Sequence, residues 1–454
     1  MSFSRWLSNH LGLSHRPSVR RKSPAARHRF RPMLEGLEQR WVPSTLTVTN
    51  IADKGVGSLR ADIAMAQSGD TIDFSNSTAN GAVNFYDGTV HTITLKSELL
   101  INKNLTITGP GAGQLTVSGN NNSRVFEVAQ AMQATLKGLT ISNGFATNGA
   151  GILVDTGAAL ALSNSTLSGN SASKTQRFVA NFGGGIDNYG TATVSNCTLT
   201  NNTSYSGGGG GIYNHATLTV NNSVMSSNSN YGIANYGTAT ISGSTVSNNA
   251  GGGIYNFGVA ALTVGDSTIS GNSTWSGGDG GGIWNAGSAT ISNCTLSGNS
   301  ASQFGGAIYS TTSSSPGSGT LNLTNCTVSG NYTTSTTNGE GGGIYIGDGT
   351  VTISSCSVSG NSAIIGGGIH IFGGADGGHG ATVTITGSTL TGNSAQYGGG
   401  IAIDYGTVTV KDSSSITGNT APTGHGADVY NLGVLYLDAT SVIGILDGNP
   451  AIPL

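Results

Sequence analysis

The stretch from Gly280 to Asn299, GGGIWNAGSATISNCTLSGN, recurs in varied form from about residue 139 nearly to the C-terminus. It divides into three short segments, 283–285, 289–291 and 294–296, which Gly, Ser and Asn corners separate. In each segment a small or apolar residue alternates with a polar or variable one, as in a strand with one buried face. Three strands and three corners make one turn of a coil. The repeats therefore predict an all-β solenoid, a parallel β-helix with three short strands per coil and roughly a dozen coils.

The spacing of the repeats places their variation in the corners. Successive third-strand residues lie between 21 and 32 positions apart, and strands cannot change length without losing register. The longest insertions, 173–182, 310–319 and 332–340, are expected to protrude on one side. The equivalent third-strand residues are Leu139, Leu167, Leu199, Met225, Val246, Ile269, Leu296, Val328, Val358, Leu390 and Ile416.

The composition suits such a coil, because 74 of the 454 residues are Gly and only 9% are charged. So much Gly and Ser is also typical of a flexible linker, but the ordered recurrence of Ile, Val and Leu favours the solenoid. The cysteines share one repeat slot and no CxxC occurs, so zinc is not expected. They are interpreted as small buried thiols, with a disulfide as the lesser alternative. The slot holds Cys197, Cys294, Cys326 and Cys356, and elsewhere Ser165, Ser223, Ser244, Ser267 and Ser388.

The chain divides by pattern into four parts. The first is basic and without periodicity, which is typical of disorder. The second begins with a strand at 45–50 and a short helix that Ser58 would cap, running through Ile63 and ending near Gly69. Such an element would cover the open end of the solenoid. The parts are 1–44, a disordered basic segment; 45–140, a cap and the first coils; 141–430, the repeats; and 431–454, a partial coil or cap.

The segment from Arg31 to Ser44, RPMLEGLEQRWVPS, resembles the RPxLExLExRxVPS segment near the N-terminus of many exported planctomycete proteins. The resemblance implies export, with an extracellular, cell-surface or outer-membrane location. The basic residues before it carry no interleaved aromatics, so nucleic acid is not an expected partner. No apolar run reaches the roughly 20 residues that span a bilayer.

Two further stretches carry resemblances. The run from Gly57 to Phe74, GSLRADIAMAQSGDTIDF, resembles the CSLREAI-type segment that precedes surface β-helix repeats, with Gly57 in place of the Cys. The GGGI repeats, with GGAIYS at 305–310, are similar to polymorphic outer-membrane-protein repeats and to right-handed β-helix surface proteins over roughly residues 45–440. The resemblance implies a right-handed, surface-exposed and adhesive protein.

Two columns of Asn are interpreted as structural. In the first strand, inward Ile residues are followed two positions later by Asn188, Asn214, Asn235, Asn256 and Asn285. Stacked Asn side chains can hydrogen bond from coil to coil. A second column follows Gly, mostly as Ser-Gly-Asn, and because Asn tolerates the left-handed conformation this column is also expected to mark the turns. It contains Asn170, Asn272, Asn299, Asn331, Asn361, Asn393 and Asn419.

Between the inward residues of the first strand lies an outward column. Exposed aromatic side chains stacked along it would form a flat surface that could hold sugar rings. The alternative is that aromatics simply strengthen the strands and their packing. The column contains Asp187, Tyr213, Ala234, Tyr255, Trp284, Tyr309, Tyr345, His370 and Ala402. Its candidate ligand-binding residues are Tyr213, Tyr255, Trp284, Tyr309, Tyr345 and His370.

No catalytic, metal or cofactor residues are predicted. The acids of the repeats are mostly isolated, one per coil, whereas a glycosidase needs paired carboxylates. The Gly-His-Gly tripeptides at 378–380 and 424–426 echo polygalacturonases, but the accompanying NTD, DD and RIK elements are missing. Thr-x-Thr pairs such as Thr217 and Thr219 resemble the ice-binding faces of some antifreeze proteins, although Thr is also the usual polar residue on an exposed strand.

The leading hypothesis is an exported, non-enzymatic β-helix that binds polysaccharide or another cell-surface component through an outward strand face. The first alternative is a divergent carbohydrate-active enzyme, a lyase or hydrolase, on the same fold. A structural spacer and an ice-binding Thr face are minor alternatives. The oligomeric state is left open.

Overall fold

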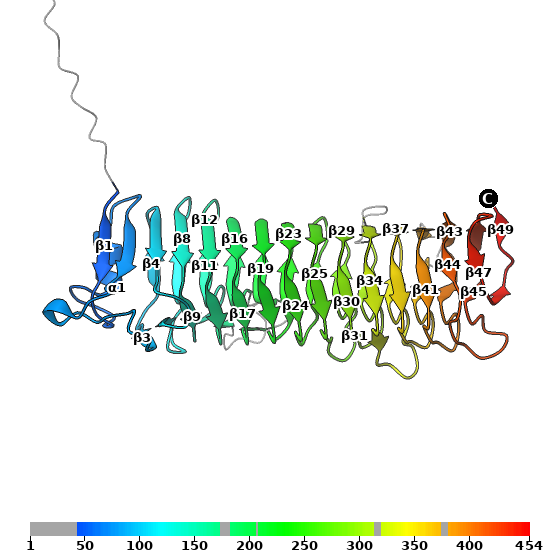
Figure 1. The fold of residues 1–454 in the computed structure, drawn as a ribbon, viewed down its shortest axis with the longest axis horizontal. Coiled ribbons are helices and arrows are strands. Elements are labelled where there is room, and N and C mark those ends of the chain that lie inside the picture. The colour runs from blue at the N-terminus through cyan, green and yellow to red at the C-terminus, as the bar shows by residue number, and fades with distance from the viewer. Residues whose placement is uncertain (1–42, 173–181, 206–207, 313–318, 374–379) are drawn as a thin grey trace, which may run out of the picture. The chain divides into compact units, whose positions relative to one another are not determined.

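The computed structural model describes residues 43–172, 182–205, 208–312, 319–373 and 380–454. The export-like segment up to residue 42, the insertion at 173–182 apart from Phe182, and residues 313–318 of the insertion at 310–319 lie outside the described residues. From Pro43 to Leu454 the chain forms one compact unit. Its strands stack coil upon coil in three long sheets whose paired strands are all parallel (Figure 1). The predicted parallel β-helix is confirmed.

The three sheets are named here after the order of their strands in one coil. The first sheet has 14 strands: β4 Leu99–Ile101, β7 Phe126–Val128, β11 Ile152–Val154, β15 Ile186–Asn188, β19 Gly209–Asn214, β22 Tyr231–Asn235, β25 Ile254–Asn256, β28 Ile283–Asn285, β32 Ile308–Ser310, β36 Ile344–Ile346, β39 Ile369–Ile371, β42 Ile401–Ile403, β45 Val429–Asn431 and β48 Leu446–Gly448.

The second sheet has 16 strands: β1 Thr45–Val48, β2 Thr71–Phe74, β5 Leu105–Thr108, β8 Gln133–Lys137, β12 Ala159–Ser163, β16 Thr191–Ser195, β20 Thr217–Asn221, β23 Thr238–Ser242, β26 Ala261–Gly265, β29 Ser288–Ser292, β33 Thr320–Thr324, β37 Thr350–Ser354, β40 Thr382–Thr386, β43 Thr407–Lys411, β46 Val434–Leu437 and β49 Ile452–Pro453.

The third sheet has 14 strands: β3 His91–Thr94, β6 Leu115–Ser118, β9 Thr140–Ser142, β13 Thr166–Ser168, β17 Thr198–Thr200, β21 Val224–Ser226, β24 Thr245–Ser247, β27 Thr268–Ser270, β30 Thr295–Ser297, β34 Thr327–Ser329, β38 Ser357–Ser359, β41 Thr389–Thr391, β44 Ser415–Ile416 and β47 Val442–Ile443. Two small corner sheets hold β10 Phe145–Ala146, β14 Ser171–Ala172, β18 Thr203–Ser204, β31 Ser300–Ala301 and β35 Tyr332–Thr333.

The repeat at Gly280–Asn299 folds as predicted, with one small correction. Its first two segments become β28 and β29, but the third strand, β30, begins at Thr295 rather than at Cys294. The correction follows from Asn293, whose φ of 54° makes the corner, so that Cys294 is the last residue of that corner. Inward residues are buried throughout the three strands, and the apolar ones form a continuous core along the solenoid.

Both Asn columns are confirmed as buried ladders. In the first sheet, the Asn235 amide donates to Asn256 Oδ1 at 2.8 Å, and Asn256 donates to Asn285 Oδ1 at 2.8 Å. In the third corner, Asn272 Nδ2 donates to Asn299 Oδ1 at 2.9 Å and to the carbonyl of Val246 at 2.9 Å. Each amide therefore satisfies buried donors and acceptors of the coils beside it.

The third-corner ladder differs from the prediction in two ways. It also includes Asn202, Asn228 and Asn249, which do not follow a Gly, and its last amide, Asn419, donates to Asp428. The left-handed conformation falls on the Gly before the Asn, with φ of 63° at Gly271, because the Asn backbone must extend so that its amide points inward.

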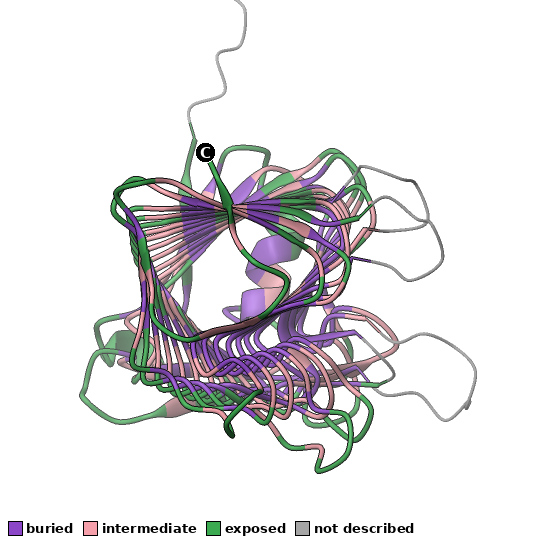
Figure 2. Ribbon diagram, turned by 90° about the vertical axis from the view of Figure 1, so that its right-hand side faces the viewer, coloured by how far each residue is buried: buried purple, intermediate pink, exposed green. Residues whose placement is uncertain are grey.

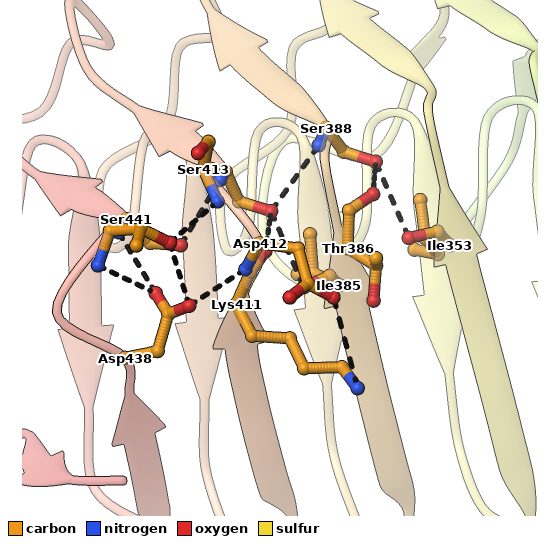
Figure 3. A network of polar contacts seen from close by, with 11 residues as sticks. Ile353, Ile385, Thr386, Ser388, Lys411, Asp412, Ser413, Asp438 and Ser441 are labelled. Atoms are coloured by element: carbon orange, nitrogen blue, oxygen red, sulfur yellow. Dashed lines mark hydrogen bonds and ion pairs between the residues drawn. The ribbon is translucent and has the colours of Figure 1, made fainter.

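The slot shared by Cys and Ser holds a third buried ladder. The Cys356 backbone N–H donates to Ser388 Oγ at 3.0 Å, and the Cys326 N–H donates to Cys356 Sγ at 3.4 Å. Towards the C-terminus the Ser388 N–H donates to Ser414 Oγ at 3.2 Å, and the Ser414 N–H donates to Ser441 Oγ at 3.0 Å. Figure 3 shows this end of the ladder, where Ser388 Oγ donates to the carbonyls of Thr386 and Ile353. Hydroxyl and thiol are interchangeable here because each is a small group that accepts one backbone N–H.

All four cysteines are buried free thiols, as predicted. Burial raises the pKa of the Cys197 thiol to about 11. Thiolate is the reactive form of cysteine, so a raised pKa together with burial makes Cys197 inert.

The predicted capping helix is present as α1, Leu59–Met65. Ser58 Oγ accepts from the Ala61 N–H, which is the expected N-cap. Leu59 and Ile63 are buried, and Figure 2, which looks along the solenoid, shows the helix within the outline of the coils. A 3-10 turn at Ala79–Gly81 follows it. No helix among the described residues is long and apolar enough to span a membrane.

Candidate functional site

The outer face of the first sheet carries the predicted outward column in strict register. Tyr255 on β25 pairs with Trp284 on β28, which pairs with Tyr309 on β32, which pairs with Tyr345 on β36. The ring centroids of Tyr255 and Trp284 lie 4.4 Å apart, those of Trp284 and Tyr309 5.8 Å apart, and those of Tyr309 and Tyr345 5.2 Å apart. The rings of each pair are within 24° of parallel, so four coils present one continuous aromatic stack.

A second column of rings flanks this stack and was missed by the sequence analysis. Its members directly follow the strands of the first sheet. Tyr236 N–H donates to the Asn214 carbonyl and Phe257 N–H to the Asn235 carbonyl, so the ladder continues one residue beyond the strand. The column contains Tyr189, His215, Tyr236, Phe257 and Phe372. The signal in the sequence was the recurrence of an aromatic or His directly after the ladder Asn, or, for Phe372, after the Ile in the same slot.

Together these rings form the aromatic face, defined as Tyr213, Tyr236, Tyr255, Phe257, Trp284, Tyr309 and Tyr345. The Phe257 ring is stacked on Tyr255 at 5.7 Å and 10°, and on Trp284 at 5.9 Å and 19°. Phe257 is 41% exposed, whereas Tyr255, Trp284 and Tyr309 are half-buried. The middle of the face is therefore open to solvent.

The expectation of a fully exposed column is wrong at three of the six candidate residues. Tyr213, Tyr345 and His370 are 4%, 7% and 1% exposed, although all three point outward from the sheet. Corner residues cover them: the Phe182 ring lies 4.3 Å from that of Tyr213, and the Phe304 ring lies 4.9 Å from that of Tyr345. Asp187, Ala234 and Ala402 of the same column are also buried.

His370 is held between two carboxylates. Its Nδ1 lies 3.1 Å from Glu340 Oε2 and its Nε2 lies 3.2 Å from Asp404 Oδ2. Burial opposes protonation of the ring, but the two carboxylates outweigh it and raise the pKa of His370. A buried His that faces a carboxylate at each nitrogen cannot reach a ligand, so we interpret His370 as a structural residue at the C-terminal end of the aromatic face.

A different cluster lies at the N-terminal end of the face. Asp187 is fully buried, and its Oδ1 is 3.4 Å from His215 Nε2. The His215 ring stacks on Tyr189 at 3.9 Å and 14°. Burial raises the pKa of Asp187, and burial together with that carboxylate raises the pKa of Tyr189 to about 12.

Beside this cluster is a pocket of about 410 Å³, which we call the acidic pocket. Its walls come from the loops and strands around β7, β11 and β15. It is lined by Arg124, Thr147, Asn148, Leu153, Asp155, Thr156 and Tyr189. Arg124 Nη1 lies 2.6 Å from Glu98 Oε2 and 2.5 Å from Glu127 Oε2, so its charge is already shared by two carboxylates.

The comparison with protein families covers most of this unit. A family model described as the right handed beta helix region matches residues 63–301 and 235–421. The chain belongs to the right-handed β-helix family. No curated protein matches this β-helix.

Membership of the family fixes the fold of this β-helix and leaves its activity open, because the family includes both enzymes and proteins without enzymatic activity. The described residues contain no group of three or more His, Cys, Asp or Glu side chains placed to hold a metal ion. The outer side of the first sheet therefore carries an array of aromatic rings that is partly exposed at its centre and has a His and carboxylates at each end.

The outer face of the second sheet is polar instead of aromatic. Thr193, Thr219, Thr240, Thr263 and Thr290 lie in one in-register column. The column two residues earlier holds Thr191, Thr217 and Thr238, followed by Ala261 and Ser288. Asn322 interrupts the column at β33. This arrangement fits the predicted Thr-x-Thr face, and ice binding by it stays a prediction.

Proposed function

We propose that this protein binds a polysaccharide along the aromatic face without cleaving it, and that it does so outside the cell or at the cell surface. The supporting observation is the ring stack from Tyr255 to Tyr345, which extends over four coils and is half-open at its centre. A pyranose ring has an apolar face that packs against an aromatic ring, and successive sugars could pack along successive coils.

The absence of cleavage is inferred from the burial of His370. Glu340, His370 and Asp404 are two acids and a base on one face, which is what a carbohydrate-active enzyme would need. Their His is 1% exposed and faces a carboxylate at each nitrogen. General acid–base catalysis requires a group within hydrogen-bonding reach of the substrate.

The proposed location outside the cell or at the cell surface rests on the resemblance of residues 31–44 to planctomycete export segments.

A glycan array with the Tyr255→Ala and Trp284→Ala variants tests the binding. Each substitution removes a stacking surface, so we expect affinity for any retained glycan to fall at least about tenfold, equivalent to about 1.4 kcal/mol. Tyr436→Ala is the matched control, because Tyr436 is a half-buried Tyr on the outer side of the second sheet, paired with Thr409.

Unchanged glycan binding in both variants would remove the aromatic face from consideration. The retained glycan should then be incubated with the protein and assayed for new reducing ends and for unsaturated products. Accumulation of either would overturn the non-enzymatic part of the proposal and favour the lyase or hydrolase alternative.

A further inference from the structure

The acidic pocket lies beside the aromatic face and is not explained by it. Its volume of about 410 Å³ falls in the range of about 300–1,000 Å³ typical of small-molecule sites. Leu153, which lines the pocket, is paired in register with Asp187 of the neighbouring coil, and Tyr189 follows that coil's strand. A polysaccharide lying on the aromatic face would reach this pocket at the N-terminal end of the ring array.

The charge around the pocket is negative. Glu98 and Glu127 share the single guanidinium of Arg124, whose Nε and Nη2 also face the Asn148 carbonyl at 3.3 and 3.4 Å. Asp155 adds a further carboxylate to the wall. Burial raises the pKa of Glu127, and the charges of Glu98 and Asp155 oppose the lowering effect of Arg124.

Independent of that acidic cluster, unsatisfied acceptors lie at and behind the pocket wall. Asp187 is 0% exposed, and its Oδ1 lies 3.4 Å from His215 Nε2, but neither carboxylate oxygen makes a hydrogen bond of good geometry. It touches the wall through Tyr189 and lies next to Leu153 on the outer side of the sheet. Asn148 Oδ1, in the wall itself, is also buried and unpartnered. A buried carboxylate whose nearest cationic neighbour is a His at 3.4 Å is costly, and the cost is offset when a further cation binds nearby.

We propose that the acidic pocket binds a positively charged amino group of the polysaccharide, so that the preferred ligand is a glycan containing unacetylated amino sugars. This inference rests on the proposed binding along the aromatic face. An ammonium group brings three N–H donors and no acceptor, which matches the Asp155 carboxylate on the pocket wall. The ring of Tyr189 adds a surface on which a cation is attracted.

The same charges argue against other ligand classes. A polysaccharide of uronic acids or sulfated sugars would bring more negative charge to a site whose one guanidinium is already paired, and like charges at close range cost free energy. A metal ion would need a cluster of ligands, and the described part of the chain holds no such group.

The test compares two oligosaccharides of equal length, a hexamer of glucosamine and a hexamer of N-acetylglucosamine, by calorimetry at a pH where the amine is protonated. We expect the glucosamine hexamer to bind at least tenfold more tightly, and this preference to shrink as salt is added, because salt screens the attraction. Asp155→Asn should remove the preference and leave the affinity for the acetylated hexamer unchanged. Asp412→Asn, the same charge change on a 60% exposed side chain of a distant coil, should leave the preference intact.

Trp284→Ala separates this inference from the proposed function. Suppose that Trp284→Ala lowers the affinity for both hexamers. If the wild-type protein then shows no preference for the glucosamine hexamer, or if Asp155→Asn leaves that preference unchanged, the acidic pocket does not bind the amine, and the aromatic face remains the binding surface. If Trp284→Ala changes neither affinity, the aromatic face fails instead. If neither hexamer binds, the inference is overturned, and the glycan array alone decides the proposed function.

Discussion

At the scale of single residues, this protein places most of the buried polar side chains of its repeats in ladders and leaves the Asp187 carboxylate outside them. Asn272 accepts from Asn249 and donates to Asn299, and every buried amide along the ladder has the same kind of partners. Asp187 is equally buried but has no hydrogen-bonded partner, and His215 approaches it only to 3.4 Å. A position of this kind costs stability, which is typical of a site kept for binding.

The cost of Asp187 predicts a pH-dependent stability. Because burial raises the pKa of Asp187 above its ordinary 3.8, the folded state holds the proton more tightly than the unfolded state. The resulting destabilisation is absent when the pH is below the ordinary pKa of 3.8. It grows as the pH rises to the pKa of Asp187 in the folded state, and it persists at higher pH. Asp187→Asn should therefore raise the melting temperature at pH 7, and the gain should vanish near pH 3.5.

Thermal melts of wild type and Asp187→Asn between pH 3.5 and 8 check this, with Asp412→Asn as the exposed control. The groups that face Asp187 are His215, Tyr189 and Arg124. If Asp187→Asn melts below wild type at pH 7, then His215 and Arg124 stabilise the carboxylate by more than its burial costs. The burial of Asp187 would then no longer support the binding of a cation in the acidic pocket.

At the scale of elements, α1 closes the N-terminal end of the core. Leu59 is fully buried against the first strands, and Arg60 fixes the helix by donating to the carbonyls of Ser97 and Glu98 at 2.6 and 2.8 Å. An open solenoid end would expose apolar side chains and unpaired strand edges, which promote association.

Leu59→Asp should therefore destabilise the protein and make it aggregate. Placing a carboxylate in this apolar site should lower the free energy of unfolding by about 3 kcal/mol or more. Met65→Asp is the matched control, since Met65 belongs to the same helix and is 57% exposed. Urea denaturation and size-exclusion chromatography measure both effects, and equal behaviour of the two variants would show that the helix does not close the core.

At the scale of the whole molecule, each coil contacts mainly its neighbours, so coils should be removable as units. The coil between Tyr231 and Gly253 is one period of 21 residues, as the spacings of Asn228 to Asn249 and of Asn235 to Asn256 show. Removing residues 232–252 joins equivalent positions and leaves all three ladders in register. This deletion should fold and melt cooperatively, with a moderate loss of stability.

Deleting Thr240 alone should be far more harmful, although it removes one residue instead of 21. A one-residue shift in β23 would turn Ile241 outward and a polar neighbour inward. Circular dichroism and thermal melts of the two deletions compare them directly. A better-folded Thr240 deletion would contradict the view that strand register holds the coils together.

Much of the fold was predictable because the same pattern of inward and outward residues recurs in every repeat. The strand period, the inward Ile and Asn residues, the Cys and Ser slot and the Ser58 cap follow from local patterns that the coil stacks in register. The sequence by itself therefore determined the fold, the core and the direction in which each strand residue points.

Only the tertiary structure decided which outward residues reach solvent. Tyr255 and Tyr345 occupy the same register position, yet Phe304 covers Tyr345 and Tyr255 stays half-open. The acidic pocket likewise joins Arg124, Asp155 and Tyr189, which lie on three successive coils. Corners vary in length from coil to coil, so what they cover depends on how neighbouring coils stack, and a period read along one chain does not contain that information.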